Sequence, residues 1–166
     1  MVLPPHYHIA PLTRGDTSLA SILAQWYYEE WKIPQEGYMP RLLALDPDDM
    51  EIHLVLFHNN KPIAAGGIHH KVGLLQVAPE FAELDPWVAV LYTLPAYRKQ
   101  GLGAMLLQAL EDAAAAFGYT KLYLYTHTAE NLYKRQGWTR LEYPAPFVAY
   151  KGSTAVVMEK AILANK

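Results

Sequence analysis

LPAYRKQGLGAMLLQAL, residues 94–110, joins a continuous apolar run (PWVAVLYTL, residues 86–94) to a strongly helical stretch. An uninterrupted apolar run is typical of a strand that is buried on both faces. A strand that leads through a glycine-rich turn into a helix leaves the first amides of that helix unpaired, at the positive end of its dipole. Gly101 and Gly103 allow a ligand to approach the backbone, and Arg98 and Lys99 add positive charge. The turn is therefore predicted to bind a pyrophosphate.

Two familiar phosphate-binding motifs do not fit this turn. A P-loop is excluded because no Gly-Lys-Ser/Thr sequence follows the glycines. A dinucleotide-binding fingerprint fits badly because Leu106 stands where the third glycine belongs. The turn also comes late in the chain, which leaves too few residues for the rest of a doubly wound nucleotide fold.

The composition indicates one globular α/β domain over residues 1–166. Of the 166 residues, 52% are hydrophobic and 18% are charged, and no linker, repeat or low-complexity segment divides them. The formal net charge of −2 gives no basic excess, which argues against nucleic acid as a partner. No apolar run is long enough to cross a bilayer, so no membrane partner is expected.

The absence of cysteine narrows the chemistry. Disulfides, thiolate metal sites and a cysteine nucleophile are excluded, and a cytoplasmic location is the simplest expectation. The histidines of HYH (residues 6–8) and HH (residues 69–70) are adjacent or alternate on expected strands, and no motif such as His-Glu-x-x-His occurs. We therefore expect no metal site.

Periodicity predicts the order of elements along the chain. The expected helices are an N-terminal one containing residues 19–31, a short one at 40–46 after a break at 33–40, one from 102 to 117, and one at 129–136. Residues 71–85 have no regular pattern and are expected to form a loop. The expected strands are 6–12, 51–57, 61–70, 86–94 and 121–126, followed by a last hairpin with a long connection between residues 138 and 160.

Two motifs carry a resemblance to a known family. Arg98, Gly101 and Gly103 fit the pattern [Q/R]-x-x-G-x-[G/A], and ENLYKRQGW (residues 130–138) fits a later helix motif at the right separation. Together with KLYLYT (121–126) and VVMEK (156–160), they resemble the GNAT superfamily of N-acetyltransferases, in particular a bacterial branch. The resemblance covers residues 86–160 well and the N-terminal half only by element order. It implies a mixed central sheet of about six to seven strands, about four flanking helices, and a splayed strand before the cofactor turn.

The resemblance also implies which residues bind acetyl-CoA as co-substrate. Amides of the turn would hold the pyrophosphate, with Arg98 and Lys99 close by, and the pantetheine arm would pair with the splayed strand. Thr93 departs mildly from the family, which usually has an aliphatic residue there. The residues assigned to this cofactor are Leu91, Tyr92, Thr93, Arg98, Lys99, Gln100, Gly101, Leu102, Gly103, Ala104 and Asn131.

The family's reaction is direct transfer of an acetyl group to an amine in a ternary complex. Tyr133 occupies the usual general-acid position, four residues before Gly137, although a ring that only packs over the cofactor would give the same spacing. The base stays open. Glu83 and Asp85 precede the buried strand, alternation allows only one of His69 and His70 to face the cleft, and a water relay is a further alternative.

The sequence leaves the acceptor unidentified. Glu29 and Glu30 can attract a cationic amine if the first helix walls the acceptor site, or they can form an ordinary solvated helix end. We expect an N-acetyltransferase acting on a primary amine of a small molecule or peptide, as a monomer or homodimer. The alternatives are a non-catalytic CoA-binding regulatory or interaction module of the same fold, and an enzyme that transfers a longer acyl group.

Overall fold

The computed structural model describes residues 2–46, 48–49 and 51–163, which form two compact units. Unit 1 falls within residues 1–68 and 90–110, and unit 2 within residues 69–89 and 111–166. The strand order of the sheet is β1-β2-β3-β4-β5-β8-β6, with β7 paired to β8. Strand β4 and helix α3 contribute residues to both units.

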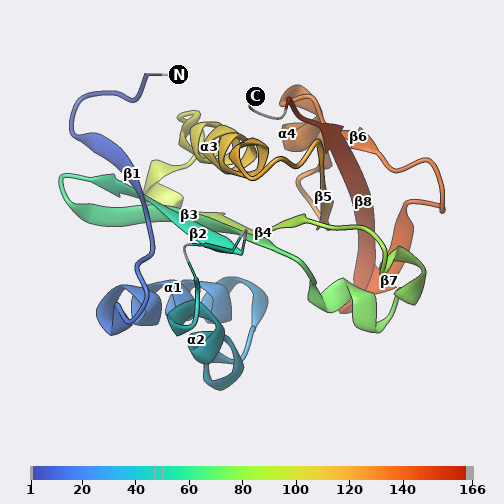
Figure 1. Ribbon diagram of the computed structural model, residues 1–166, viewed down its shortest axis with the longest axis horizontal. Helices are drawn as coiled ribbons and strands as arrows, with labels where there is room; N and C mark the ends of the chain where they lie inside the picture. The colour runs from blue at the N-terminus through green and yellow to red at the C-terminus, as the bar shows by residue number, and fades with distance from the viewer. Residues whose placement is uncertain (1, 47, 50, 164–166) are drawn as a thin grey trace. The chain divides into compact units, whose positions relative to one another are not determined.

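Unit 1 contains an antiparallel set of strands (Figure 1). The turn between the second and third of them is Asn59-Asn60, with φ of 50° and 65°, a conformation that asparagine tolerates in tight hairpins. The backbone N–H of Leu94 donates to the carbonyl of Ile63 at 2.9 Å, just beyond the end of β4. The antiparallel strands are β1 (Tyr7–Pro11), β2 (Ile52–His58) and β3 (Lys61–His69), and β4 (Trp87–Thr93) follows β3 in the strand order.

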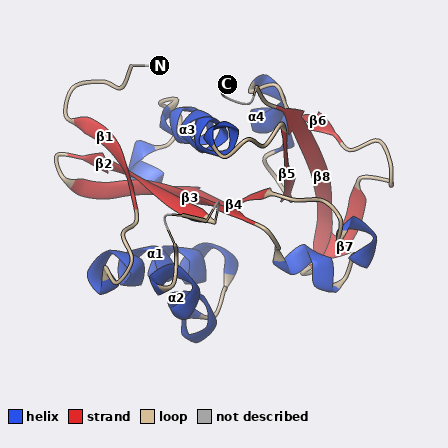
Figure 2. Ribbon diagram, viewed as in Figure 1, coloured by secondary structure: helices blue, strands red, loops and turns tan. Residues whose placement is uncertain are grey.

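Helices cover both faces of these strands, with α1 and α2 on one face and α3 on the other (Figure 2). Asp16 caps the first helix, because its side chain accepts a hydrogen bond from the amide of Leu19 at 3.1 Å. Successive residues of a strand point to opposite faces of the sheet, so neighbouring residues of β2 and β3 pack against different helices. Val55 and Ala65 pack with α1, and Leu56 and Ala64 pack with α3. The helices are α1 (Thr17–Trp31), α2 (Gln35–Leu43) and α3 (Leu102–Ala116).

The second helix differs from the sequence prediction. We expected a break over residues 33–40 and a helix at 40–46, but α2 begins at Gln35 and contains Pro40. Pro34 is the N-cap, with an extended backbone, and Glu36 lies in the first turn, where a negative charge is favourable. Proline acts here as a helix-start signal, whereas the prediction interpreted it only as a break.

Unit 2 is built around β8, and all its pairings with β5, β6 and β7 are antiparallel. The first residue of β4, Trp87, pairs in parallel with Tyr123 of β5. Residues 71–85, expected to be a loop, contain two short 3₁₀ turns, at Gly73–Gln76 and Pro79–Phe81. The other elements are β5 (Lys121–Thr126), α4 (Glu130–Arg135), β6 (Thr139–Arg140), β7 (Phe147–Tyr150) and β8 (Ser153–Ala161).

The predicted fold class is confirmed: the chain is a mixed α/β protein. The part of the chain that the structure describes has eight strands and four α-helices, against the expected six to seven strands and four helices. The additional strand is β7, which lies in the stretch predicted as a long connection. It pairs along β8 from Ser153 to Val156 and buries Val148. No helix among the described residues is long and apolar enough to cross a membrane.

A buried histidine makes the stability of unit 1 depend on pH. His53 on β2 is 1% exposed, and its Nε2 lies 2.7 Å from the hydroxyl of Tyr27 on α1. Burial, helped by the positive charge of Arg41, lowers the pKa of His53 to about 3. In the unfolded chain a histidine has a pKa near 6.5, so the unfolded state takes up this proton first as the pH falls.

We predict that the free energy of unfolding falls by about 1.4 kcal/mol per pH unit below pH 6.5 on account of His53. The contribution is fully present above pH 6.5 and is lost progressively toward pH 3. Urea unfolding between pH 7.5 and 5 measures it above the range where most carboxylates titrate. His53→Gln should flatten this slope, and the exposed His8→Gln should not. Equal slopes in wild type and His53→Gln would contradict the assignment.

Candidate active site

Strand β4 has an irregular backbone at Val90. This residue has a φ of 50°, in the left-handed region that β-branched side chains rarely adopt. Left-handed residues inside strands are typical of bulges, which bend the strand and end its regular pairing. The expected splayed segment, Leu91 to Thr93, follows immediately. The structure therefore gives this segment a local cause for departing from a regular ladder.

The turn after β4 contains two residues with left-handed backbone conformations, and its glycines leave the main chain accessible to a ligand. A 3₁₀ turn over Pro95–Tyr97 leads to Lys99 and Gly101, whose φ angles are 63° and 79°. Helix α3 begins at the next residue, Leu102, whose side chain is buried in the core of unit 1. The first turn of α3 thus starts directly after a glycine in the left-handed conformation.

Hardly any atom of the described residues lies close to the two glycines at the start of this helix. A Cβ atom added at Gly101 would meet no heavy atom within 4 Å. One added at Gly103 would meet only the Oγ1 of Thr93, at 3.5 Å. Unpaired amides at the N-terminus of a helix, with no side chain over them, suit a phosphate group. The residues present therefore fit the pyrophosphate of acetyl-CoA.

The side chain of Arg98 lies back along the end of β4. Its Nε donates to the carbonyl of Thr93 at 2.8 Å, and its guanidinium lies 5.5 Å from the centre of the Tyr92 ring. Its Nη2 is 3.8 Å from a carboxylate oxygen of Glu30 on α1. These contacts connect the turn to β4 and to the first helix. A direct contact of Arg98 with the cofactor stays a prediction.

The side chain of Tyr92 belongs to the core rather than to a ligand surface. It is buried, and its ring contacts Trp26 and Trp31 of α1 at centroid distances of 5.4 and 6.0 Å. Only the backbone of Tyr92 is then left for a ligand, which agrees with a pantetheine arm held by main-chain groups. Unit 1 thus brings together residues 91–93 and the turn at residues 98–104.

In unit 2, helix α4 carries Tyr133 and is anchored at both ends. Thr126 accepts a hydrogen bond from the amide of Ala129 at 3.0 Å, before the helix starts. After it ends, Lys160 donates to the carbonyl of Gln136 at 2.7 Å while its Nζ lies 2.5 Å from the buried carboxylate of Glu111. A helix of six residues is not stable alone, so these contacts hold it in place.

Charged residues on α4 reinforce this anchoring. Glu130 forms ion pairs with Arg140 and, at 3.3 Å, with Lys134. The Arg140 hydrogen bonds, followed by those of Lys134, hold the pKa of Glu130 down at about 2. Glu130 therefore remains a carboxylate at neutral pH and keeps these contacts.

The geometry of Tyr133 suits a group that donates a proton. The partly buried ring lies edge-on to Trp138, with centroids 6.2 Å apart. Burial raises the pKa of Tyr133 to about 12, so its hydroxyl keeps its proton at any physiological pH. The helix ends at Arg135 with Gln136 as its C-cap, and Gly137 follows with a φ of 91°. The catalytic role itself stays a prediction.

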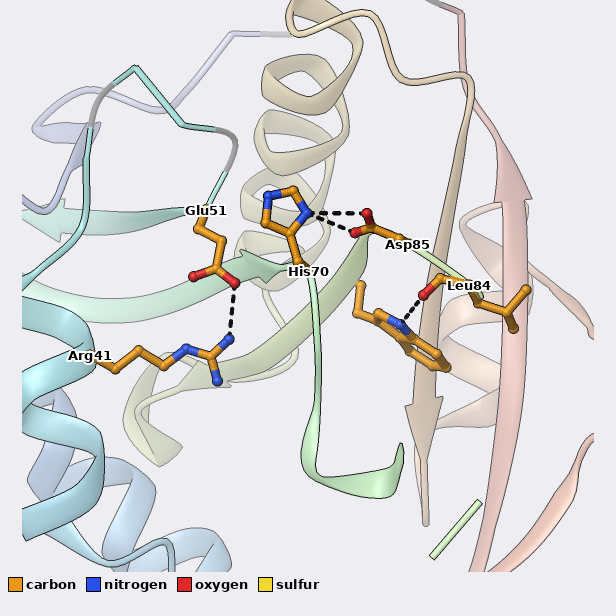
Figure 3. A network of polar contacts seen from close by, with 6 residues as sticks. Arg41, Glu51, His70, Leu84 and Asp85 are labelled. Atoms are coloured by element: carbon orange, nitrogen blue, oxygen red, sulfur yellow. Dashed lines mark hydrogen bonds and ion pairs between the residues drawn. The ribbon is translucent and has the colours of Figure 1, made fainter. Parts of the chain in front are cut away.

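The remaining site candidates in unit 2 differ in their surroundings. Glu83 and Asp85 are both exposed, as is Asn131 on α4. His69 is buried, whereas the ring of His70 contacts the carboxylate of Asp85 (Figure 3). From the sequence alone the imidazole and the carboxylate were rival base candidates, and no pattern indicated this contact. Among the described residues, no group of three His, Asp or Glu side chains is placed to hold a metal ion.

Comparison with known proteins agrees with this geometry. Residues 17–138 match the model of the Acetyltransferase (GNAT) family. The aminoglycoside 6'-N-acetyltransferase from Enterococcus faecium superposes with a TM-score of 0.72 at 15% identity, over 96% of this chain and 99% of that one. The ribosomal-protein-S18-alanine N-acetyltransferase from Escherichia coli gives 0.67 at 17% identity, over 96% of each chain. No curated protein matches the sequence.

A third similar structure is an aminoglycoside 6'-N-acetyltransferase complexed with coenzyme A. Its TM-score is 0.71 at 13% identity, over 96% of this chain and 99% of that one. At such identities these structures establish the fold alone, and the family model establishes the family. The chain belongs to the GNAT acetyltransferase family, whose members are acyltransferases that use acetyl-CoA.

The open space at Gly103 gives a direct test of the turn. Gly103→Val places a branched side chain over the start of α3, where the phosphates would lie. We expect the affinity for acetyl-CoA to fall more than tenfold, which corresponds to about 1.4 kcal/mol of binding free energy. Titration calorimetry on the folded variant measures this. Gly37→Val is a matched control, because a Cβ at Gly37 of α2 meets nothing within 4 Å, so the larger side chain is accommodated there as well. Unchanged affinity in Gly103→Val would contradict the phosphate site.

Proposed function

We propose that the protein transfers an acetyl group from acetyl-CoA to a primary amine of a small molecule or peptide, by direct attack in a ternary complex. The observation that carries the proposal is the open, glycine-lined start of α3, which follows a strand with a left-handed residue at Val90. Two of the similar structures are named for an aminoglycoside and a protein alanine as acceptors, which supports an amine.

Backbone groups would hold the cofactor. Amides from Gln100 to Ala104 would bind the pyrophosphate, with Lys99 beside it, and the main chain of Leu91 to Thr93 would bind the pantetheine arm. Amides of this segment near Tyr92 would also donate to the oxyanion that forms on the attacked carbonyl, which is the kind of charge stabilisation that acyl transfer needs most. Asn131 of α4 is the remaining proposed cofactor contact.

Tyr133 would act on the sulfur that leaves. Its burial keeps the hydroxyl protonated, so it can donate a hydrogen bond to the thiolate as the carbon–sulfur bond breaks. The acceptor would lie near the end of α1, where Tyr28, Pro34, Gln35 and Glu36 line a hollow. Exposed carboxylates there, including Glu29, suit a cationic amine. A cytoplasmic location, and a monomer or homodimer, are parts of this proposal that rest on sequence alone.

Ligand specificity provides the first test. Acetyl-CoA at a hundredfold excess over its Kd should stabilise the protein by about 2.7 kcal/mol, seen as a rise in Tm. NAD and ATP share the pyrophosphate but lack the pantetheine arm, so their effect should be much smaller. Equal shifts with all three ligands would mean that the turn recognises phosphate only, and would contradict an acetyl-CoA site.

The second test separates an enzyme from a non-catalytic CoA-binding module. Tyr133→Phe removes one hydroxyl and keeps the ring against Trp138, so acetyl-CoA affinity should stay within a few fold. Loss of a donor to the departing thiolate should lower kcat by about 10²- to 10⁴-fold. Steady-state CoA release with a panel of amines measures kcat, and the cysteine-free chain contributes no thiol background.

Either of two results would remove Tyr133 from this role. Full activity of Tyr133→Phe would leave water as the donor. A large loss of affinity with unchanged kcat would assign the residue to cofactor binding instead. Acetyl-CoA binding without turnover of any amine by the wild type would favour the non-catalytic module.

A further inference from the structure

Tyr97 connects the turn that follows β4 to the end of β2. Its hydroxyl lies 3.0 Å from Nδ1 of His58, the last residue of β2, and the two rings meet edge to face with centroids 5.5 Å apart. The ring of Tyr7, on β1, stacks on His58 with centroids 4.3 Å apart. Figure 2 shows the turn after β4 beside β1 and β2. All three residues belong to unit 1, as does the start of α3.

Tyr97 is also the residue through which the turn packs against the rest of unit 1. Of residues 95–101, Tyr97 alone is half-buried and the others are exposed. Its ring packs against the apolar cluster that includes Leu102 and Leu106 of α3. Arg98 adds contacts to the end of β4 and to α1, but its side chain is exposed. The Tyr97 ring and its hydrogen bond are therefore the main attachment of the turn.

The backbone next to Tyr97 needs such an attachment. Lys99 has a φ of 63°, in a region that residues with a Cβ atom rarely adopt, and Gly101 follows with a φ of 79°. A residue keeps such a conformation only where the surrounding structure fixes it. Tyr97 lies two residues before Lys99, and the buried Leu102 lies three residues after it. Fixed points on both sides thus confine the turn.

The conformation of the turn determines how its amides face a phosphate. The amides proposed to bind the pyrophosphate begin at Gln100, three residues after Tyr97. If the free turn had several conformations, only the fraction with these amides in place could bind, and the apparent Kd would rise by the inverse of that fraction. A turn that is held in its binding conformation before the ligand arrives avoids this loss.

We propose that Tyr97 and His58 are positioning residues for the cofactor: their hydrogen bond holds the turn in the conformation that binds the pyrophosphate of acetyl-CoA. This rests on the proposed function, because it takes the turn to be the pyrophosphate site. The contact forms with either neutral tautomer of the imidazole, since a hydroxyl both donates and accepts. Neither side chain needs to touch the cofactor. The pair acts on the diphosphate part of the ligand and leaves recognition of the pantetheine arm unchanged.

Titration calorimetry with acetyl-CoA tests the role of the hydroxyl. Tyr97→Phe removes the hydroxyl and keeps the ring in its apolar surroundings, so the affinity should fall about 2- to 10-fold, as for one lost hydrogen bond. Tyr7→Phe is the matched control, because it removes a hydroxyl from the same cluster but not the one that contacts His58. It should bind as tightly as the wild type. Unchanged affinity in Tyr97→Phe, or an equal loss in Tyr7→Phe, would overturn the proposal.

Variants of His58 test the other side of the contact. His58→Leu removes Nδ1 and should lower the affinity as much as Tyr97→Phe does. His58→Asn places an amide group where Nδ1 stood, and should restore much of the affinity. Because both residues act through one hydrogen bond, the double variant Tyr97→Phe/His58→Leu should bind no more weakly than either single variant. Losses that add would overturn the proposal, since they would mean that the two residues act independently.

Two further measurements distinguish a held turn from a general loss of stability. Acetyl-pantetheine lacks the diphosphate, so it should bind equally to wild type and Tyr97→Phe in ligand-observed NMR. In the ligand-free protein, ¹⁵N relaxation should show that Lys99 and Gly101 are rigid in the wild type and more mobile in Tyr97→Phe, with little change in Tm. A turn that is equally mobile in both proteins would overturn the proposal, as would an equal loss of affinity for both ligands.

Failure of this inference can be told from failure of the proposed function. Wild-type protein that does not bind acetyl-CoA would contradict the proposed cofactor site and the positioning role with it. A protein that binds acetyl-CoA, loses this affinity in Gly103→Val and keeps it in Tyr97→Phe would contradict the positioning role alone.

Discussion

The left-handed backbone of Val90 is the constraint on which the candidate site depends. A β-branched residue in this region costs about 1 to 3 kcal/mol and persists only where the surrounding structure fixes it. Its neighbours supply that support: Trp87 is buried beside β5, and Tyr92 is buried against α1. Without this irregularity, β4 would continue as an ordinary ladder, and its last residues would have no reason to present main-chain groups to a ligand.

The sequence predicted the parts of the fold that depend on local patterns. The apolar run of β4 and the helix at residues 102–117 both came from hydrophobic periodicity. The conformation of Val90 could not be predicted, because valine normally favours regular strands and no local pattern indicates a left-handed backbone there. The start of α2 was missed because the residues around Pro34 read equally well as a break and as a helix cap.

The candidate site was predictable to a similar extent. The spacing of two motifs selected the turn and Tyr133, since both lie on elements whose ends the sequence marks with glycine. The contact between His70 and Asp85 was not predictable, because it joins the two ends of a segment, residues 71–85, that has no periodic pattern. Alternation did indicate that His69 and His70 face opposite ways, and the structure shows that His69 is the buried one.

On the proposed mechanism, the raised pKa of Tyr133 determines how its proton must move. A phenol of pKa about 12 cannot simply protonate a thiolate whose reference pKa is about 8.5, because that transfer is uphill by about 4.8 kcal/mol. If the phenol instead recovers a proton from the intermediate's nitrogen as it gives one to sulfur, no tyrosinate accumulates and the net transfer is downhill. An ammonium that becomes an amide must lose two protons. Tyr133 would carry one to sulfur, and the other must pass to a base or directly to water.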